Sequence, residues 1–373
     1  NTFITPFMSI IFYIFYISIF FQQSFGTPLA FVGQDSLNVT QLHSRLFVFD
    51  PQFISSPPSL SLTLKLKTAS ELPTKTLQSL WCRLSSQKSP ALCVASGTGN
   101  NGFQIFAYDL DQQKPHVFMS KPVVCTAKST NDCRTSLAFT NKYGFEVEFA
   151  TISHDENQDT FYNAASHGVI FDASNTTHPS ISLNSKRPIT FVTRGVLSSF
   201  ASIPVPHLNA ICLLTNEGEF KQTFLFCQDY DTSLRKVVMN ITNLYNKPFN
   251  FPVCRNVPSK TPTIACFNND ASAPSVVLLD LTKQIVIRLP LLKNAAQQLD
   301  GRQFYGDRAT ITRLNGTSLL LVPASDSSAS KQRSDLLAVF DVSPANRTMT
   351  PFLIELPGVS RTEALSGFWP LGA

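Results

Sequence analysis

The sequence predicts an all-β fold, a six-bladed β-propeller of four-stranded antiparallel blades whose ring is closed by the C-terminal strand. Three observations predict it. An alternating apolar strand that ends in aspartate recurs along the chain, eight cysteines fall into close pairs, and the C-terminal segment Leu365–Ala373 offers one more apolar strand. The repeated aspartates recur at nearly equal intervals and are Asp50, Asp109, Asp172, Asp229, Asp280 and Asp341.

Each repeat reads as four short strands. An apolar run leads in, a loop follows, the second run ends in Asp, and a further apolar strand comes after a turn, as in VVLLDLTKQIVIRLP from Val276 to Pro290. Four short strands in every repeat are typical of a propeller blade, with a β-sandwich or a β-helix as the alternative. Only Leu292–Gly301 and Thr362–Leu365 look helical.

The repeated aspartates favour a structural role over a catalytic one. An Asp at the end of a strand can accept hydrogen bonds from backbone N–H groups two residues further on and so fix the turn. Function is then expected where the units differ, or at loops near the centre of the ring. The phenylalanines, 31 of 373 residues, are expected to fill the space between blades.

The N-terminal segment predicts export. Residues 1–26 carry no charge, and the apolar run Ile10–Phe21 is followed by Ser24 and Gly26 at the small positions of a cleavage site. We therefore expect a signal peptide at residues 1–26, a single propeller domain at 27–373, and a secreted, extracellular protein. The alternative is a signal anchor, because Ile4–Phe21 approaches the length of a membrane span. Membrane attachment is expected only if the segment stays uncleaved.

The cysteine spacing predicts disulfides between neighbouring strands. Each close pair brackets a turn-like stretch between two apolar runs, and an even number of cysteines fits an oxidising compartment. Free buried thiols are the alternative, and a zinc site is disfavoured because no C-x-x-C occurs. The pairs in order are Cys82 and Cys93, Cys125 and Cys133, Cys212 and Cys227, and Cys254 and Cys266.

Glycosylation and composition point to the same class of protein. Five N-x-[ST] sequons predict a glycoprotein, at Asn38, Asn175, Asn240, Asn315 and Asn346. The chain is 43% hydrophobic and 15% charged, which excludes a disordered chain and a coiled coil. Thirty basic residues against 25 acidic ones form no stripe, so no nucleic-acid partner is expected.

The candidate chemistry consists of acidic and amide side chains on loops. Those that follow a second strand are Asp35, Asn216, Glu217, Asn268, Asp270 and Asp326, and those of the longest interval between repeats are His154, Asp155, Asn157 and Asp159. They are candidate ligand- or metal-facing groups, with ordinary turn chemistry or a solvated acidic loop as the alternative.

The sequence assigns no cofactor, and a calcium ion is the candidate for this loop. The run from Asp155 to Asp159 opens like an EF-hand loop, but Thr160 and Ser166 occupy the positions that need Gly and Glu, so an EF-hand is excluded. A looser calcium site stays open. The chain has no G-x-S-x-G, no phosphate-binding loop and no recognisable triad, so the catalytic residues are unknown and enzymatic activity is left open.

The pattern of strands that end in Asp resembles the secreted six-bladed propellers of the broad class that contains NHL, gluconolactonase-like and yellow-like proteins. This resemblance covers about 340 residues and implies the fold alone; the metal ligands of the gluconolactonase type do not match by position. The sequence therefore predicts a secreted, disulfide-containing glycoprotein that binds a protein or small-molecule ligand, with a metal-dependent hydrolase of the lactonase or esterase type as the alternative.

Overall fold

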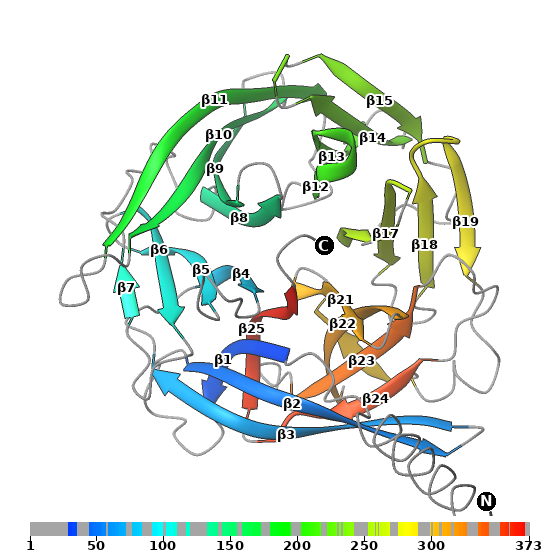
Figure 1. The fold of residues 1–373 in the computed structure, drawn as a ribbon. Coiled ribbons are helices and arrows are strands. Elements are labelled where there is room, and N and C mark those ends of the chain that lie inside the picture. The colour runs from blue at the N-terminus through cyan, green and yellow to red at the C-terminus, as the bar shows by residue number, and fades with distance from the viewer. Residues whose placement is uncertain are drawn as a thin grey trace, which may run out of the picture.

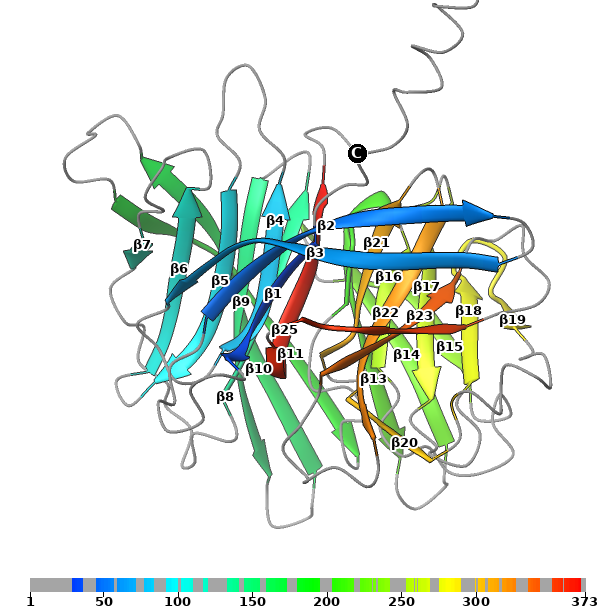
Figure 2. The same ribbon diagram turned by 90° about the horizontal axis from the view of Figure 1, so that it is seen from below.

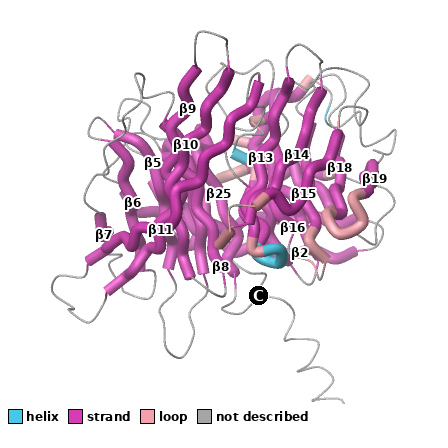
Figure 3. Tube along the Cα trace, turned by 90° about the horizontal axis from the view of Figure 1, so that it is seen from above, coloured by secondary structure: helices cyan, strands magenta, loops and turns pink. Residues whose placement is uncertain are grey.

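Strands make up nearly all the regular structure of the described residues (Figure 3), with one turn of 3-10 helix at Pro206–Leu208. The structure is a computed structural model. It describes residues 29–35, 45–56, 59–71, 77–83, 92–99, 102–109, 117–119, 133–140, 144–154, 159–172, 180–194, 203–217, 222–229, 231–232, 234–241, 253–257, 259, 261–268, 275–289, 299, 301–305, 308–314, 317–326, 335–342, 351–357 and 359–369.

The strands form antiparallel sheets that follow one another around a ring, which is a β-propeller arrangement (Figure 1). Four of the sheets are separate blades. They comprise β8 (Cys133–Thr140), β9 (Gly144–His154), β10 (Asp159–Asp172) and β11 (Ser180–Arg194); β12 (Ile203–Val205), β13 (Ala210–Glu217), β14 (Gln222–Asp229) and β15 (Arg235–Asn240); β16 (Val253–Val257), β17 (Thr263–Asn268), β18 (Ser275–Asp280) and β19 (Ile285–Leu289); and β20 (Arg302–Phe304), β21 (Thr310–Leu314), β22 (Thr317–Asp326), β23 (Leu336–Asp341) and β24 (Phe352–Glu355).

The remaining strands form one eight-stranded sheet, which corrects the expectation of six separate four-stranded blades. Its order is β3-β2-β1-β25-β4-β5-β6-β7. Two pairs of residues join β25 to β4 in parallel, and this short pairing is what merges two groups of four strands. The strands are β1 (Leu29–Asp35), β2 (Arg45–Ser56), β3 (Ser59–Glu71), β4 (Leu77–Arg83), β5 (Leu92–Gly99), β6 (Gly102–Asp109), β7 (Val117–Met119) and β25 (Val359–Trp369).

The two ends of the chain meet in this sheet. β25 pairs antiparallel with β1, from Leu29 opposite Gly367 to Asp35 opposite Val359. The C-terminal strand therefore supplies the strand that the first repeat lacks, as the sequence predicts. The helix expected at Thr362–Leu365 is wrong, because these residues lie inside β25 and pairing with β1 overrides their local preference. Figure 2 shows β2 and β3 running across the side of the ring, where β3 contacts β24.

The repeated aspartates stand at equivalent places in the sheets. Five of them are the last residue of a third strand, and only Asp50 lies inside its strand, because β2 continues to Ser56. Oδ1 of Asp229 accepts hydrogen bonds from the N–H groups of Asp231 (2.7 Å) and Thr232 (2.8 Å). Oδ1 of Asp280 accepts from the two equivalent N–H groups at 3.0 Å. For these two residues the predicted turn-fixing role is confirmed.

Three disulfides cross neighbouring strands within a sheet. Cys82–Cys93 joins β4 to β5, Cys212–Cys227 joins β13 to β14, and Cys254–Cys266 joins β16 to β17. In each pair the two cysteines are direct register partners, with Cα atoms 4.0 to 4.1 Å apart. The predicted pairing of neighbours is confirmed for these three. Cys125 lies outside the described residues.

The core lies between the sheets, where the apolar faces of adjacent sheets meet. One cluster joins the sheet β16–β19 to the sheet β20–β24, and there the ring of Phe267 lies 5.5 Å from that of Phe304 and 5.4 Å from that of Phe340. Phenylalanine thus packs between sheets, as expected. Sheets also meet through polar bonds, since the buried hydroxyls of Ser96 on β5 and Thr135 on β8 lie 2.8 Å apart.

Residues 1–26 lie outside the described residues, so the expected signal peptide and the boundary at residue 27 stay predictions. Within the described ranges there is no helix with the length and apolar character that a membrane crossing needs.

Candidate functional site: an interrupted innermost strand

The innermost strand of the sheet β20–β24 is broken in two, and a proline on its neighbour explains the break. β20 pairs with β22 up to Ala324, and β21 pairs with β22 from Leu321. Between them lies Pro323, whose carbonyl faces the inner side and accepts a hydrogen bond from the N–H of Tyr305 at 2.8 Å. The N–H and C=O of a strand residue point to the same side of the strand. Proline has no N–H, so at Pro323 the ladder between β22 and the innermost strand lacks one donor.

The chain leaves the ladder at this point and presents Tyr305 and Arg308. The Arg308 N–H donates to the Tyr305 carbonyl at 3.1 Å, which closes a tight turn. The Arg308 guanidinium carbon lies 4.9 Å from the centroid of the Tyr305 ring, a cation–π contact. The Tyr305 hydroxyl is 3.3 Å from the buried hydroxyl of Ser325. Both side chains are half-buried.

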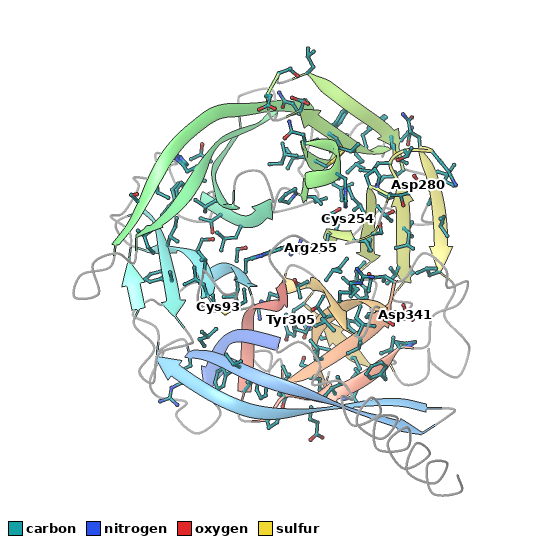
Figure 4. All side chains as sticks on the ribbon, in the orientation of Figure 1. Cys93, Cys254, Arg255, Asp280, Tyr305 and Asp341 are labelled. Carbon is teal, nitrogen blue, oxygen red and sulfur yellow. A yellow bond between two sulfur atoms is a disulfide. The ribbon has the colours of Figure 1, made fainter. Side chains whose placement is uncertain are left out.

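A second arginine reaches the same turn from the next sheet. Arg255 on β16 donates from Nε to the Ala309 carbonyl at 2.7 Å and from a terminal nitrogen to the Cys254 carbonyl at 2.9 Å. Figure 4 places Arg255 and Tyr305 closer to the centre of the ring than Asp280 and Asp341. We name Arg255, Tyr305 and Arg308 the inner-strand site, because Arg255 of one sheet binds the backbone of the turn that carries the other two.

The alternation of strand residues directs more arginines to this side. Ala309 and Ile311 pack into the cluster between the sheets β16–β19 and β20–β24, so Arg313, two residues further, points to the same face. Phe304 packs there as well, which assigns Arg302 to the same face of β20. Four arginines on the innermost strands β16, β20 and β21 and on the connecting turn are thus assigned to the boundary between the sheets β16–β19 and β20–β24.

Two further polar groups on these innermost strands are buried without a hydrogen-bond partner. They are Oδ1 of Asn256 on β16 and Oγ1 of Thr312 on β21, and the Thr312 side chain is fully buried. Buried polar atoms usually find a partner in the protein or in ordered water. The innermost strands β16 and β21 therefore carry polar atoms that have no partner among the residues that the structure describes.

Acidic and amide residues were expected to face a ligand, and most of them are located at the ends of the second strands of their sheets. Asp35 ends β1, Asn216 and Glu217 end β13, and Asn268 and Asp326 end β17 and β22. The repeated topology directs these strand ends to one rim of the ring, but in separate sheets. Among the side chains that the structure describes, no three His, Cys, Asp or Glu gather where they could hold a metal ion.

The remaining predicted positions lie partly outside the described residues. His154 ends β9 and Asp159 begins β10, so they flank one hairpin, whose turn with Asp155 and Asn157 is not described. Asn240 is the last residue of the outermost strand β15 and is exposed. The other predicted positions outside the described residues are Asp270, Asn38, Asn175, Asn315 and Asn346.

One histidine has a perturbed acidity. His167 on β10 lies on the face of the sheet that packs against β4–β7, with its ring 5.3 Å from that of Phe149. Burial lowers the pKa of His167 below its ordinary value, because an apolar environment disfavours the charged imidazolium.

The inner-strand site contains residues that the sequence analysis did not single out. The sequence patterns indicate carboxylates, amides and histidines, whereas this site consists of arginines and a tyrosine. A signal was available, since Pro323 interrupts the apolar run LLLVPASD, and a proline inside a predicted strand indicates a bulge. Bulges are over-represented next to functional sites.

No protein-family model matches the chain, and no curated protein matches it. The resemblance to the NHL, gluconolactonase-like and yellow-like class is therefore not confirmed. Among solved structures, a mutant of the Aleuria aurantia lectin in complex with Fucα1-6GlcNAc aligns with 85% of this chain and 93% of its own, at 7% identity and a TM-score of 0.48.

A sialidase of Trypanosoma rangeli in complex with sialic acid aligns with 85% of this chain at 8% identity and a TM-score of 0.43. This chain spans about half of the sialidase, 51% of its length. These TM-scores and identities assign the chain to no family.

Proposed function

We propose that this protein is an extracellular, disulfide-stapled β-propeller of six blades that binds a ligand at the inner-strand site. The six-blade count rests on reading the eight-stranded sheet as two blades, β25-β1-β2-β3 and β4-β5-β6-β7, in contact through the two residue pairs between β25 and β4. Each half then has a repeated aspartate in its third strand, Asp50 in β2 and Asp109 in β6, as the four separate blades do.

The extracellular assignment is supported by the disulfides. Three buried disulfides within one chain are typical of proteins that mature in an oxidising compartment. The exposed Asn240 at the end of an outermost strand is an accessible position for a glycan. The uncharged segment 1–26 supports export of the chain through the secretory pathway.

The ligand-binding assignment rests on one observation, the interruption opposite Pro323. Regular strand pairing is interrupted there, and the turn that replaces it carries Tyr305 and Arg308. Arg255 of the next sheet donates a hydrogen bond to the same turn. If the inner strand served only to complete the sheet, it would run without interruption, as β22 and β23 do. Polar groups on a rigid scaffold are the usual composition of a binding site.

A thermal-shift panel tests this function. The full chain, secreted from a eukaryotic host, is heated with monosaccharides, quaternary amines and dicarboxylic acids at concentrations into the millimolar range. At least one class should raise Tm saturably in the native protein and in Lys283→Gln, and much less in Arg308→Gln. Lys283 is an exposed turn residue whose loss changes the net charge equally, so it is the matched control. A panel without a saturable response, or responses that Arg308→Gln leaves unchanged, would overturn the proposal.

A further inference from the structure

We infer that a second copy of this chain binds along β19, the outermost strand of the sheet β16–β19. Two molecules then join their sheets edge to edge about a twofold axis. This contact is independent of the inner-strand site, since β19 lies at the outside of the ring (Figure 1).

The edge of β19 lacks the features that usually keep outermost strands from pairing, which are short length, clustered basic residues, proline or a covering segment. Of the six outermost strands that the structure describes, five have one of these features: β7 has three residues, β24 is contacted by β3, β11 contains Pro188, β3 contains Lys65 and Lys67, and β15 begins with Arg235 and Lys236. β19 has the sequence IVIRL, with Arg288 as its single charge. Its edge is therefore the most open to another strand.

The backbone of β19 has groups to offer to such a strand. Within the described ranges, the backbone hydrogen bonds of its five residues go to β18 alone. In the neighbouring sheet the Asp229 N–H donates to the Leu234 carbonyl at 2.9 Å, so a hydrogen-bonded pair closes that turn. Asp280 and Ile285 close the equivalent turn, and bonded and non-bonded pairs alternate along an antiparallel ladder. Every second residue of β19, starting from position 286, therefore directs its N–H and C=O outwards.

The first residue of β19 is an exposed aliphatic side chain. Ile285 is 44% exposed, and Leu234, at the equivalent place in the neighbouring sheet, is 67% exposed. Both stand five residues after a repeated Asp, where the other repeats have a polar residue, namely Ser55, Lys114, Thr177 and Asn346. Leu234 is followed by two basic residues, whereas Ile285 is followed by Val and Ile, so an apolar edge continues only along β19.

The sequence of β19 fits a second β19 in one register. A twofold contact between two such strands is antiparallel, and outward-directed residues must face each other. With Arg288 opposite itself, two like charges would be paired directly, which is destabilising. With Val286 opposite itself, Arg288 would face Gln284, which has a φ of 53° and precedes the strand.

The remaining register sets Val286 opposite Arg288 of the second copy, and the reverse. It forms two hydrogen-bonded pairs and separates the two Arg288 charges. The same register places the exposed Ile285 opposite Leu289 and sets Ile287 opposite its own copy, so the flanking pairs are apolar. β19 is thus complementary to itself in charge, in hydrogen bonding and in apolar side chains.

The expected dimer is weak. A stable interface buries about 1,600 Å² in total, and a five-residue edge is much smaller. We therefore expect a dissociation constant in the micromolar to millimolar range.

Sedimentation velocity of the full chain, secreted from a eukaryotic host, tests the contact over this range of concentrations. The native chain should show a reversible, concentration-dependent dimer. Ile285→Lys should weaken it at least about tenfold, because an ammonium group would face an apolar side chain of the second copy. Leu234→Lys is the matched control, since it makes the same change at the equivalent exposed position and should leave the dimer as it is.

Cysteine substitution tests the register. Ile287→Cys should form a disulfide between two molecules under mild oxidation, as directly opposed residues do within this chain. Ile285→Cys should not, because position 285 lies four residues from its own copy along the paired strands, about 13 Å at about 3.3 Å per residue. Near-UV circular dichroism identifies a variant that fails to fold. If Ile287→Cys fails, the two exposed lysine variants carry the test.

The inference would be overturned by a native chain that stays monomeric at every concentration. It would also be overturned by a dimer that Ile285→Lys leaves intact or that Leu234→Lys weakens equally, because β19 would then not be the contact. Cross-linking at position 285 as readily as at 287 would exclude the proposed register.

Discussion

Replacing both members of the Cys212–Cys227 disulfide with alanine tests how the chain stabilises its sheets. The bridge closes a loop with a sequence separation of 15 residues. In the chain-entropy model, opening a loop of this length stabilises the unfolded state by about 3 kcal/mol at 25 °C. Both cysteines are fully buried in the cluster between the sheets β12–β15 and β16–β19, so the loss of two sulfur atoms adds a packing cost of about 1 kcal/mol.

The other two disulfides among the described residues provide the matched comparison. Their sequence separations are 11 and 12 residues, for which the same model gives about 2.8 kcal/mol each. Because the loops are so similar, the three double-alanine variants should lose nearly equal free energies of unfolding. The assay is equilibrium unfolding in urea, followed by far-UV and near-UV circular dichroism, with reversibility checked by dilution.

A loss below about 1 kcal/mol in all three variants would refute stabilisation by loop closure, because the loop entropy would then be absent. Losses that differ widely between the variants would show that local packing around each bridge, and not loop closure, sets its contribution. A change in m-value without a change in midpoint would point to the unfolded state as the place where the bridge acts.

Three further predictions follow from the fold. Asp280→Ala should lower the free energy of unfolding by about 1–3 kcal/mol, since two backbone N–H groups lose their acceptor, whereas Asp280→Asn keeps the Oδ1 acceptor and should cost less in the same urea assay. Burial lowers the pKa of His167 in the folded state, so the unfolded state binds more protons as pH falls below 6.5, and the free energy of unfolding should fall there. His167→Phe should therefore flatten the pH dependence of the urea midpoint between pH 5 and 6.5. An unchanged slope would contradict this. Truncation before Val359 removes β25 from its place between β1 and β4 and should abolish cooperative unfolding, while an unaltered transition in the truncated chain would show that β25 is dispensable.

Local patterns account for the parts of the fold that the sequence predicts well. Alternating apolar residues that end in Asp predict a strand and its turn, because both depend on neighbours within a few residues. Asp229 and Asp280 form the predicted turns, and the disulfides pair neighbours because an antiparallel hairpin brings their Cα atoms to about 4 Å. The Gly99–Gly102 turn follows the same rule, with a positive φ of 110° at Gly102 that suits only glycine.

Contacts between distant segments account for the parts that local reasoning missed. Thr362–Leu365 has a helical local preference, but β1, the first strand of the described chain, makes it a strand. The merging of two groups of four strands into one sheet depends on two residue pairs between β25 and β4, which no periodicity in the sequence encodes. The predicted acidic residues end strands at one rim of the ring, whereas the inner-strand site lies on the innermost strands of two sheets.

The amino-acid sequence predicts the all-β class, the repeat, the turns at Asp229 and Asp280 and the pairing of neighbouring cysteines, since each follows from short-range geometry. Tertiary packing places Arg255 on β16 against the Ala309 carbonyl, in the turn of a different sheet that carries Tyr305 and Arg308. The physical reason is that sheet-to-sheet packing sets which inner strands are neighbours. A single missing N–H at Pro323 then determines where the inner ladder opens and presents its polar side chains.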